Sequence, residues 1–481
     1  MRVQKDITCT KWYLRIAFPL FLAVSISGCA ENTDNQNTTY IYPSWLNHVG
    51  FAQFGSFDLR LFLGNKTRFD NPQGMTVFVP VGEKYPVCVW VNSGQNAIVY
   101  NRSHFSLDRN GFKTPLSLQV SGKNFPIEGK MKIPWGITSD KHGNFYVVDR
   151  GNSRVLKLSY ANRDPQDGDL TVSHQIGSPG SDPGDFLDPR GVAMVGIGLI
   201  AVVDNSLNRV TILNDSGDVQ RYWEGLNEPL SIASSYATSQ SAGEDSLSDF
   251  LIVVDSLDRR VTKFDYEGNI LAQSDAMKWN PPLTPELNFI AIDRFHQILI
   301  TDRNNNCIHK LDRDLNYLTR FGQSGNDDYQ FDQPRGIAIE PESGRLMVVE
   351  RERLQIFLVA VEVPKFDIVV ISDSTWRDLQ VNFRTTEQAL VDFDLLNEYG
   401  QFVARLIESK LYPAGENHLS WGMSIPKTLP DGRPLPALPP PCQAGEKLPE
   451  GKYRIKGTFR ATYGSKDVFV KEKSAEFDLK W

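Results

Sequence analysis

The chain has 481 residues, of which 23% are charged, and a formal net charge of −7. This composition is that of an ordinary globular protein of roughly two to four domains, and five cysteines exclude a disulfide scaffold. The negative net charge also argues against a nucleic-acid binder that depends on a strongly basic surface.

Residues 1–28 have the pattern of a secretory signal peptide. Four basic residues precede the apolar run Ile16–Ile26, which is shorter than the about 20 residues of a permanent membrane helix. The run ends in Ile26-Ser27-Gly28-Cys29, which resembles a bacterial lipobox. That resemblance implies lipid such as palmitate on Cys29, a polar tether over 29–50, and anchoring to a membrane of the bacterial cell envelope, the outer one if the cell has two. Without residues 1–28 the net charge becomes −10.

A repeated block fills the middle of the chain. Most copies open on Pro-x-Gly, continue with an apolar strand and a second strand that ends in a polar residue, and add a third strand after a polar turn. The residues that end the second strands are Asn92, Asp149, Asp204, Asp255, Asp302 and Glu350. Successive members lie 47 to 57 residues apart, which is the length of a propeller blade. The pattern predicts an all-β chain with a six-bladed β-propeller over 51–363.

These copies resemble NHL repeats, whose signature is the Pro-x-Gly opening with an Asp and, five residues later, an Arg. Three copies keep that pair: Asp149 and Arg154, Asp204 and Arg209, Asp255 and Arg260. Two openings depart from the pattern, at Pro229-Leu230-Ser231 and Pro285-Glu286-Leu287. We interpret the Asp and Arg residues as structural, because an Asp at a strand end can hold the following turn. We also expect residues 58–64 to form a strand that completes the last blade.

Residues 364–481 lose the blade pattern and show several short strand-like runs, which predicts a β-sandwich. Val391–Leu396, Pro413–Asn417 and Trp421-Gly422 resemble the FlgD-type Ig-like domain, a module that is typically a spacer in surface proteins. Met423 departs from the family's usual Trp-Asp-Gly, and eight prolines between Pro426 and Pro449 replace a short turn.

The openings of the first strands and the turns after the second strands are expected on one face of the propeller. Loops on that face converge on the axis, which makes it the default ligand site. The candidate ligand-binding residues are Gln73, Trp135, Arg150, Arg190, Glu286, Arg303, Arg335 and Arg351. Arginine matches carboxylate and phosphate groups and Trp stacks on sugars, so we expect a protein, peptide or glycan ligand. Ordinary surface charge is the alternative interpretation.

Some families with this fold are enzymes, among them peptide-amidating lyases and streptogramin-type lyases, which use a histidine-bound metal. Here the histidines do not converge on the axis; His174 and His309, for example, are expected in outer strands. We therefore predict no catalytic residue, metal or cofactor, and we expect Cys88 and Cys307 to be buried thiols. The sequence favours a lipid-anchored envelope binding or scaffold protein, with no nucleic-acid partner and with a propeller lyase or glycan-acting hydrolase as the alternative.

Overall fold

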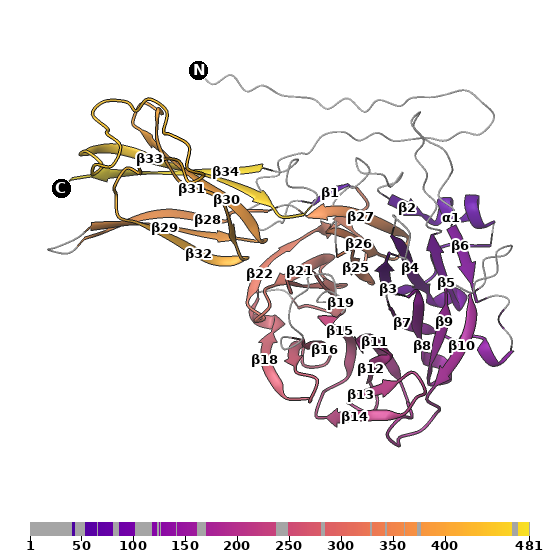
Figure 1. The fold of residues 1–481 in the computed structure, drawn as a ribbon. Helices are drawn as coiled ribbons and strands as arrows, with labels where there is room; N and C mark the ends of the chain where they lie inside the picture. The colour runs from indigo at the N-terminus through magenta and orange to yellow at the C-terminus, as the bar shows by residue number, and fades with distance from the viewer. Residues whose placement is uncertain are drawn as a thin grey trace, which may run out of the picture. The chain divides into compact units, whose positions relative to one another are not determined.

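A computed structural model describes most of the chain beyond residue 40 (Figure 1). The described residues are 41–43, 53–64, 66–79, 86–101, 118–122, 125, 127–140, 142–160, 170–236, 249–279, 284–327, 330–341, 344–359, 361–372, 377–463 and 470–480. Their regular structure is almost entirely strand, which confirms the predicted all-β fold. No helix among them has the length and apolar character needed to cross a membrane. The expected signal peptide and Cys29 lie outside the described residues.

Six antiparallel sheets follow one another along the chain. The first comprises β3 (Pro72–Phe78), β4 (Val87–Asn92), β5 (Ala97–Asn101) and β6 (Leu118–Ser121). The second comprises β7 (Pro134–Ser139), β8 (Asn144–Asp149), β9 (Arg154–Ser159) and β10 (Thr171–Ile176). The third comprises β11 (Pro189–Gly196), β12 (Leu199–Asp204), β13 (Arg209–Asn214) and β14 (Val219–Glu224). The fourth comprises β15 (Pro229–Ser234), β16 (Leu251–Asp255), β17 (Arg260–Phe264) and β18 (Ile270–Asp275). The fifth comprises β19 (Leu287–Ile292), β20 (Ile298–Asp302), β21 (Cys307–Leu311) and β22 (Tyr317–Phe321).

The sixth sheet contains β25 (Ile337–Ile339), β26 (Arg345–Val349) and β27 (Arg353–Val359). Two N-terminal strands, β1 (Ile41–Pro43) and β2 (Gln53–Gly55), pair antiparallel with β27 and thereby join the start of the chain to its last sheet. A short parallel pair, β23 (Gln323–Ser324) and β24 (Gln330–Phe331), connects the fifth and sixth sheets.

The first strands of the sheets form a closed ring. Each contacts the first strand of the next sheet, and β25 contacts β3. Hydrophobic clusters fill the space between neighbouring sheets: one joins the fifth and sixth sheets around Phe289 and Ile337, and another joins the sixth and first around Met347 and Trp90. This closed arrangement, in which every sheet packs against two others, is that of a β-propeller.

The glycines of the Pro-x-Gly openings lie where two inner strands approach most closely. A Cβ atom on Gly136 would lie 2.4 Å from the carbonyl oxygen of Arg190 in the next sheet. A Cβ atom on Gly336 would lie 2.2 Å from the carbonyl oxygen of Gln73, at the contact that closes the ring. The repeat therefore keeps glycine at these positions because a side chain would force neighbouring sheets apart.

The expectation of a strand over 58–64 is wrong. These residues belong largely to the α-helix α1 (Ser56–Leu63), since Leu and Arg are good helix formers and the segment has no β-branched residue. Gly64, with a φ of 90°, ends the helix and donates its N–H to the Arg60 carbonyl at 3.0 Å. The strands that complete the last sheet are β2 and β1, and β1 lies within the segment expected to be tether.

The C-terminal module consists of two sheets that share one hydrophobic core. One sheet contains β28 (Lys365–Ser372), β29 (Arg377–Thr385) and β32 (Gly415–Trp421). The other contains β31 (Phe402–Tyr412), β30 (Ala389–Asn397), β33 (Gly451–Ala461) and β34 (Val470–Leu479). Strand β28 was missed from the sequence. The FlgD-type resemblance stays a prediction.

Candidate axial ligand site

The polar residues that end the second strands fix the entrances of the first strands. In the second sheet Pro134 pairs with Asp149, so the opening of β7 and the end of β8 lie at the same edge. Asp149 is fully buried; its Oδ1 accepts the Lys132 N–H at 2.6 Å, and its Oδ2 accepts from Nε of Arg154 at 2.8 Å. The corresponding acids Asp204, Asp255 and Asp302 also accept an N–H from the segment that enters the first strand. These contacts agree with the structural interpretation of the repeated acids.

The register identifies the residues that occupy the axial positions. In the fifth sheet Leu287, not Pro285, pairs with the strand-ending Asp302, as Pro134 pairs with Asp149 in the second. Asn288 therefore holds the position that we assigned to Glu286, because the opening of β19 starts two residues later than its proline suggests. The residues at this position of the six sheets, which we call the axial ring, are Gln73, Trp135, Arg190, Leu230, Asn288 and Arg335.

Trp135 lies between arginines of the second and third sheets. The guanidinium carbons of Arg190 and Arg150 lie 4.6 Å and 5.1 Å from its ring centroid. Both arginines bind the carboxylate of Asp188, Arg190 through Nη2 at 2.8 Å and Arg150 through Nε. Burial alone would raise the pKa of Asp188, but the hydrogen bonds from the two arginines hold it below its ordinary value. Because these two cations already lie over the indole ring, a sugar has little room to stack on it.

A second group of charges surrounds Arg335. Arg303 binds Glu286 at 2.7 Å, and Arg351 binds Asp332 at 3.3 Å. Arg335 itself donates to neutral acceptors, namely Oδ1 of Asn71, the Pro72 carbonyl at 3.3 Å and Oε1 of Gln333 at 3.5 Å.

Burial lowers the pKa of Arg335 to about 10, and the positive charge of Arg303 adds to this effect. Gln73, which is 2% exposed, donates to the same Asn71 oxygen at 3.0 Å. The structure thus brings Gln73 and Arg335 into contact with one acceptor.

Three axial-ring side chains carry a buried polar atom for which the described residues provide no hydrogen-bond partner. These atoms are Nε1 of Trp135, Oδ1 of Asn288 and Nε of Arg335. Buried polar groups are nearly always paired, and three unpaired atoms lie here at one layer of the ring. Trp135 also packs against the cluster that contains Phe289 and Ile337, so its side chain reaches strands that do not neighbour its own.

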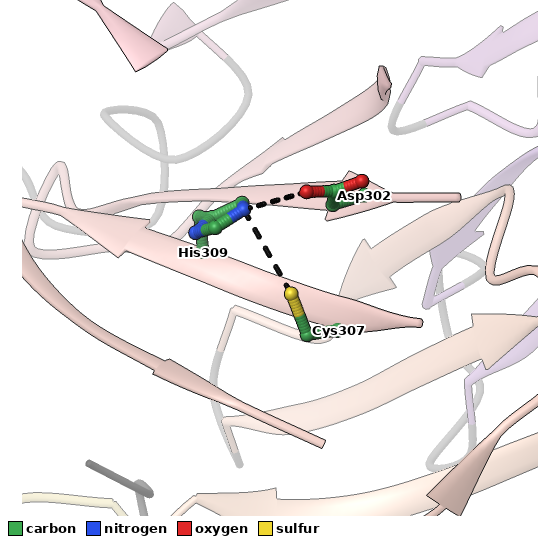
Figure 2. Close-up of side chains that lie close together, drawn as sticks. All are labelled: Asp302, Cys307 and His309. Atoms are coloured by element: carbon green, nitrogen blue, oxygen red, sulfur yellow. Dashed lines mark hydrogen bonds and ion pairs between the residues drawn. The ribbon is translucent and has the colours of Figure 1, made fainter. Parts of the chain in front are cut away.

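A different cluster, on the outer part of the fifth sheet, combines three residue types that can bind metals (Figure 2). The potential ligand atoms of Asp302, Cys307 and His309 lie within 4.8 Å of one another, and all three residues are buried. His309 Nε2 lies 3.0 Å from Asp302 Oδ2 and 3.8 Å from Cys307 Sγ. One signal of this cluster is visible in the sequence, because Cys307 stands five residues after Asp302, where three other repeats have Arg.

The hydrogen bonds of this cluster favour a structural role over metal binding. Oδ1 of Asp302 accepts N–H groups of Glu286, Asn304 and Asn305, and Oδ2 accepts from the Asn305 amide at 2.7 Å in addition to His309. Burial raises the pKa of Cys307 to about 12, which keeps it a thiol, as expected from the sequence. His309 thus occupies the place of the missing arginine as the partner of the strand-ending acid.

Comparisons with known proteins found one family model and several solved structures that resemble parts of this chain. A family model described as NHL repeat matches residues 132–158. Among solved structures, virginiamycin B lyase from Staphylococcus aureus shares 13% identity over 59% of this chain and 79% of that chain, with a TM-score of 0.38. A gluconolactonase from Xanthomonas campestris shares 11% identity over 61% of this chain and 88% of that chain, with a TM-score of 0.41. Likeness at this level does not extend to activity. The chain is a β-propeller protein that contains an NHL repeat.

Proposed function

We propose that this protein is a ligand-binding β-propeller whose axial face holds a protein, peptide or glycan. The observation that carries the proposal is the convergence of Trp135, Asn288 and Arg335, each with a buried polar atom left unpaired, on one layer of the ring. Four of the five arginines predicted for this face pair with three carboxylates, those of Asp188, Glu286 and Asp332, and the fifth is Arg335. These eight side chains together therefore carry a positive charge, although the chain as a whole is acidic.

Peptide and glycan arrays probed with the purified protein test this function. Arg190→Ala should abolish the binding of ligands that the parent retains, because it removes a cation that lies over Trp135 and binds Asp188. Arg433→Ala is the matched control, since Arg433 is 67% exposed and pairs with Asp431 in the C-terminal module. If Arg190→Ala leaves every array signal unchanged, the axial face is not the binding site.

We also propose that the protein acts at a bacterial membrane surface through lipid on Cys29, with the C-terminal module as a spacer. The support is the Ile26-Ser27-Gly28-Cys29 sequence after a short apolar run. Metabolic labelling with palmitate should mark the parent protein and not Cys29→Ser, which should leave the membrane fraction. Equal labelling of the two proteins would refute the anchor.

A further inference from the structure

The most unusual charge in the axial ring is that of Arg335. Arg335 is only 7% exposed, and the hydrogen-bond acceptors that the described residues offer it are all neutral. Arg303 and Arg351, by contrast, each bind a carboxylate. Burying a guanidinium group without an anion is costly, because water no longer compensates its charge. We infer that the axial ring binds its ligand through a carboxylate group that pairs with Arg335, an inference that rests on the proposed function.

The hydrogen-bond pattern of Arg335 leaves one edge of its guanidinium group for such a ligand. Nη1 donates to Asn71 and to the Pro72 carbonyl, so that side of the group is occupied. Nε has no partner among the described residues, and Nη2 makes one long contact of 3.5 Å to Gln333. Nε and Nη2 together form an edge of the planar fork that a carboxylate engages through two parallel hydrogen bonds.

The local charge balance favours one negative charge on the ligand. Around Arg335 there are three guanidinium groups, since Arg303 and Arg351 are nearby, and two carboxylates, those of Glu286 and Asp332. A single carboxylate neutralises the remaining charge. A phosphate dianion would leave an excess negative charge beside these two acids.

The other unpaired atoms of the ring indicate what accompanies the carboxylate. Trp135 Nε1 can donate to a ligand oxygen, and Asn288 Oδ1 can accept from a ligand hydroxyl or N–H group. A sugar acid and the acidic side chain of a peptide both offer this combination.

Isothermal titration calorimetry with pairs of ligands that differ only in charge tests the inference on the parent protein. D-glucuronate is compared with D-glucuronamide, and acetyl-Gly-Asp-Gly-amide with its Asn counterpart; inorganic phosphate serves as the dianion. We expect one acid to bind at least tenfold more tightly than its amide, and the pair that responds identifies a sugar or a peptide source. Equal affinity of acid and amide in both pairs, tighter binding of phosphate, or no binding of either acid would overturn the inference.

Two variants then assign the effect to Arg335. Arg335→Gln should remove the preference for the acid over its amide, whereas Arg433→Gln, far along the chain in the C-terminal module, should keep it. Because Arg335 is buried, its variant is first checked by circular dichroism and melting temperature; if it does not fold, the acid–amide comparison on the parent decides. If the array ligands are uncharged and their binding depends on Arg190, the carboxylate inference is wrong. The proposed function would still stand in that case.

Discussion

Replacing Gly136 with Ala tests whether the inner strands depend on glycine for their close approach. The added Cβ atom would lie 2.4 Å from the Arg190 carbonyl oxygen, 3.1 Å from the Gly191 Cα and 3.2 Å from the Val192 nitrogen. All three are main-chain atoms, so no side-chain rotation relieves the contact, and β7 and β11 must separate. Overpacking of this kind typically costs about 1–3 kcal/mol, and the rigidity of the neighbours places Gly136→Ala near the upper value.

A loss of about 3 kcal/mol corresponds to a fall in melting temperature of about 6 °C, at roughly 2 °C per kcal/mol for a large domain. The assay is thermal unfolding followed by far-UV circular dichroism. Gly422→Ala is the matched control, because a Cβ atom there meets no heavy atom within 4 Å, and its melting temperature should stay close to the parent's. If Gly136→Ala melts together with Gly422→Ala, close packing of the inner strands is not the reason for the repeated glycine.

Three further outcomes follow from the contacts between strands. Asp149→Ala should lower the free energy of unfolding by about 3–5 kcal/mol in urea titrations, because it leaves the buried Arg154 without its carboxylate partner. A loss below about 1 kcal/mol, which is typical of an exposed ion pair, would contradict this role. Burial alone would raise the pKa of Asp302, but hydrogen bonds from His309 and Asn305 hold it below its ordinary value. Its contribution to stability is therefore present above about pH 4 and is lost as the pH falls toward the folded-state pKa. His309→Ala should shift this loss to higher pH in urea midpoints measured across the acid range, and an unchanged profile would refute the pairing. Deletion of residues 41–55 removes β1 and β2 from β27 and should lower the melting temperature, whereas an unchanged value would show that these strands do not stabilise the last sheet.

Local patterns were sufficient where each repeat specifies its own sheet. The runs Val219–Trp223 and Tyr317–Phe321 lie in β14 and β22, because alternating or apolar runs between turns define a strand without reference to distant residues. The same reasoning failed at 58–64, where an apolar run of helix formers fits a helix and a strand equally well before its neighbours are known.

The axial residues illustrate a second limit. Trp135, Arg190 and Arg335 follow the proline of their openings, so their shared position could be predicted from sequence. Asn288 could not, because only the pairing of Leu287 with Asp302 reveals that the fifth opening is displaced from Pro285. Likewise the sequence shows that Cys307 stands where three other repeats have Arg. That His309 binds Asp302 in place of this arginine depends on the distance between β20 and β21.

The sequence by itself determined the all-β class, the repeat length and the residues that tie each strand entrance to its turn, because those interactions are local and recur. The tertiary structure decided which strands complete the last sheet, which residues form the axial ring, and that the guanidinium group of Arg335 donates only to neutral acceptors among the described residues. These features depend on charges and backbone groups that different sheets bring together. Arg335, for example, donates to Asn71, which lies 264 residues earlier in the chain, and spacing along the sequence does not predict that contact.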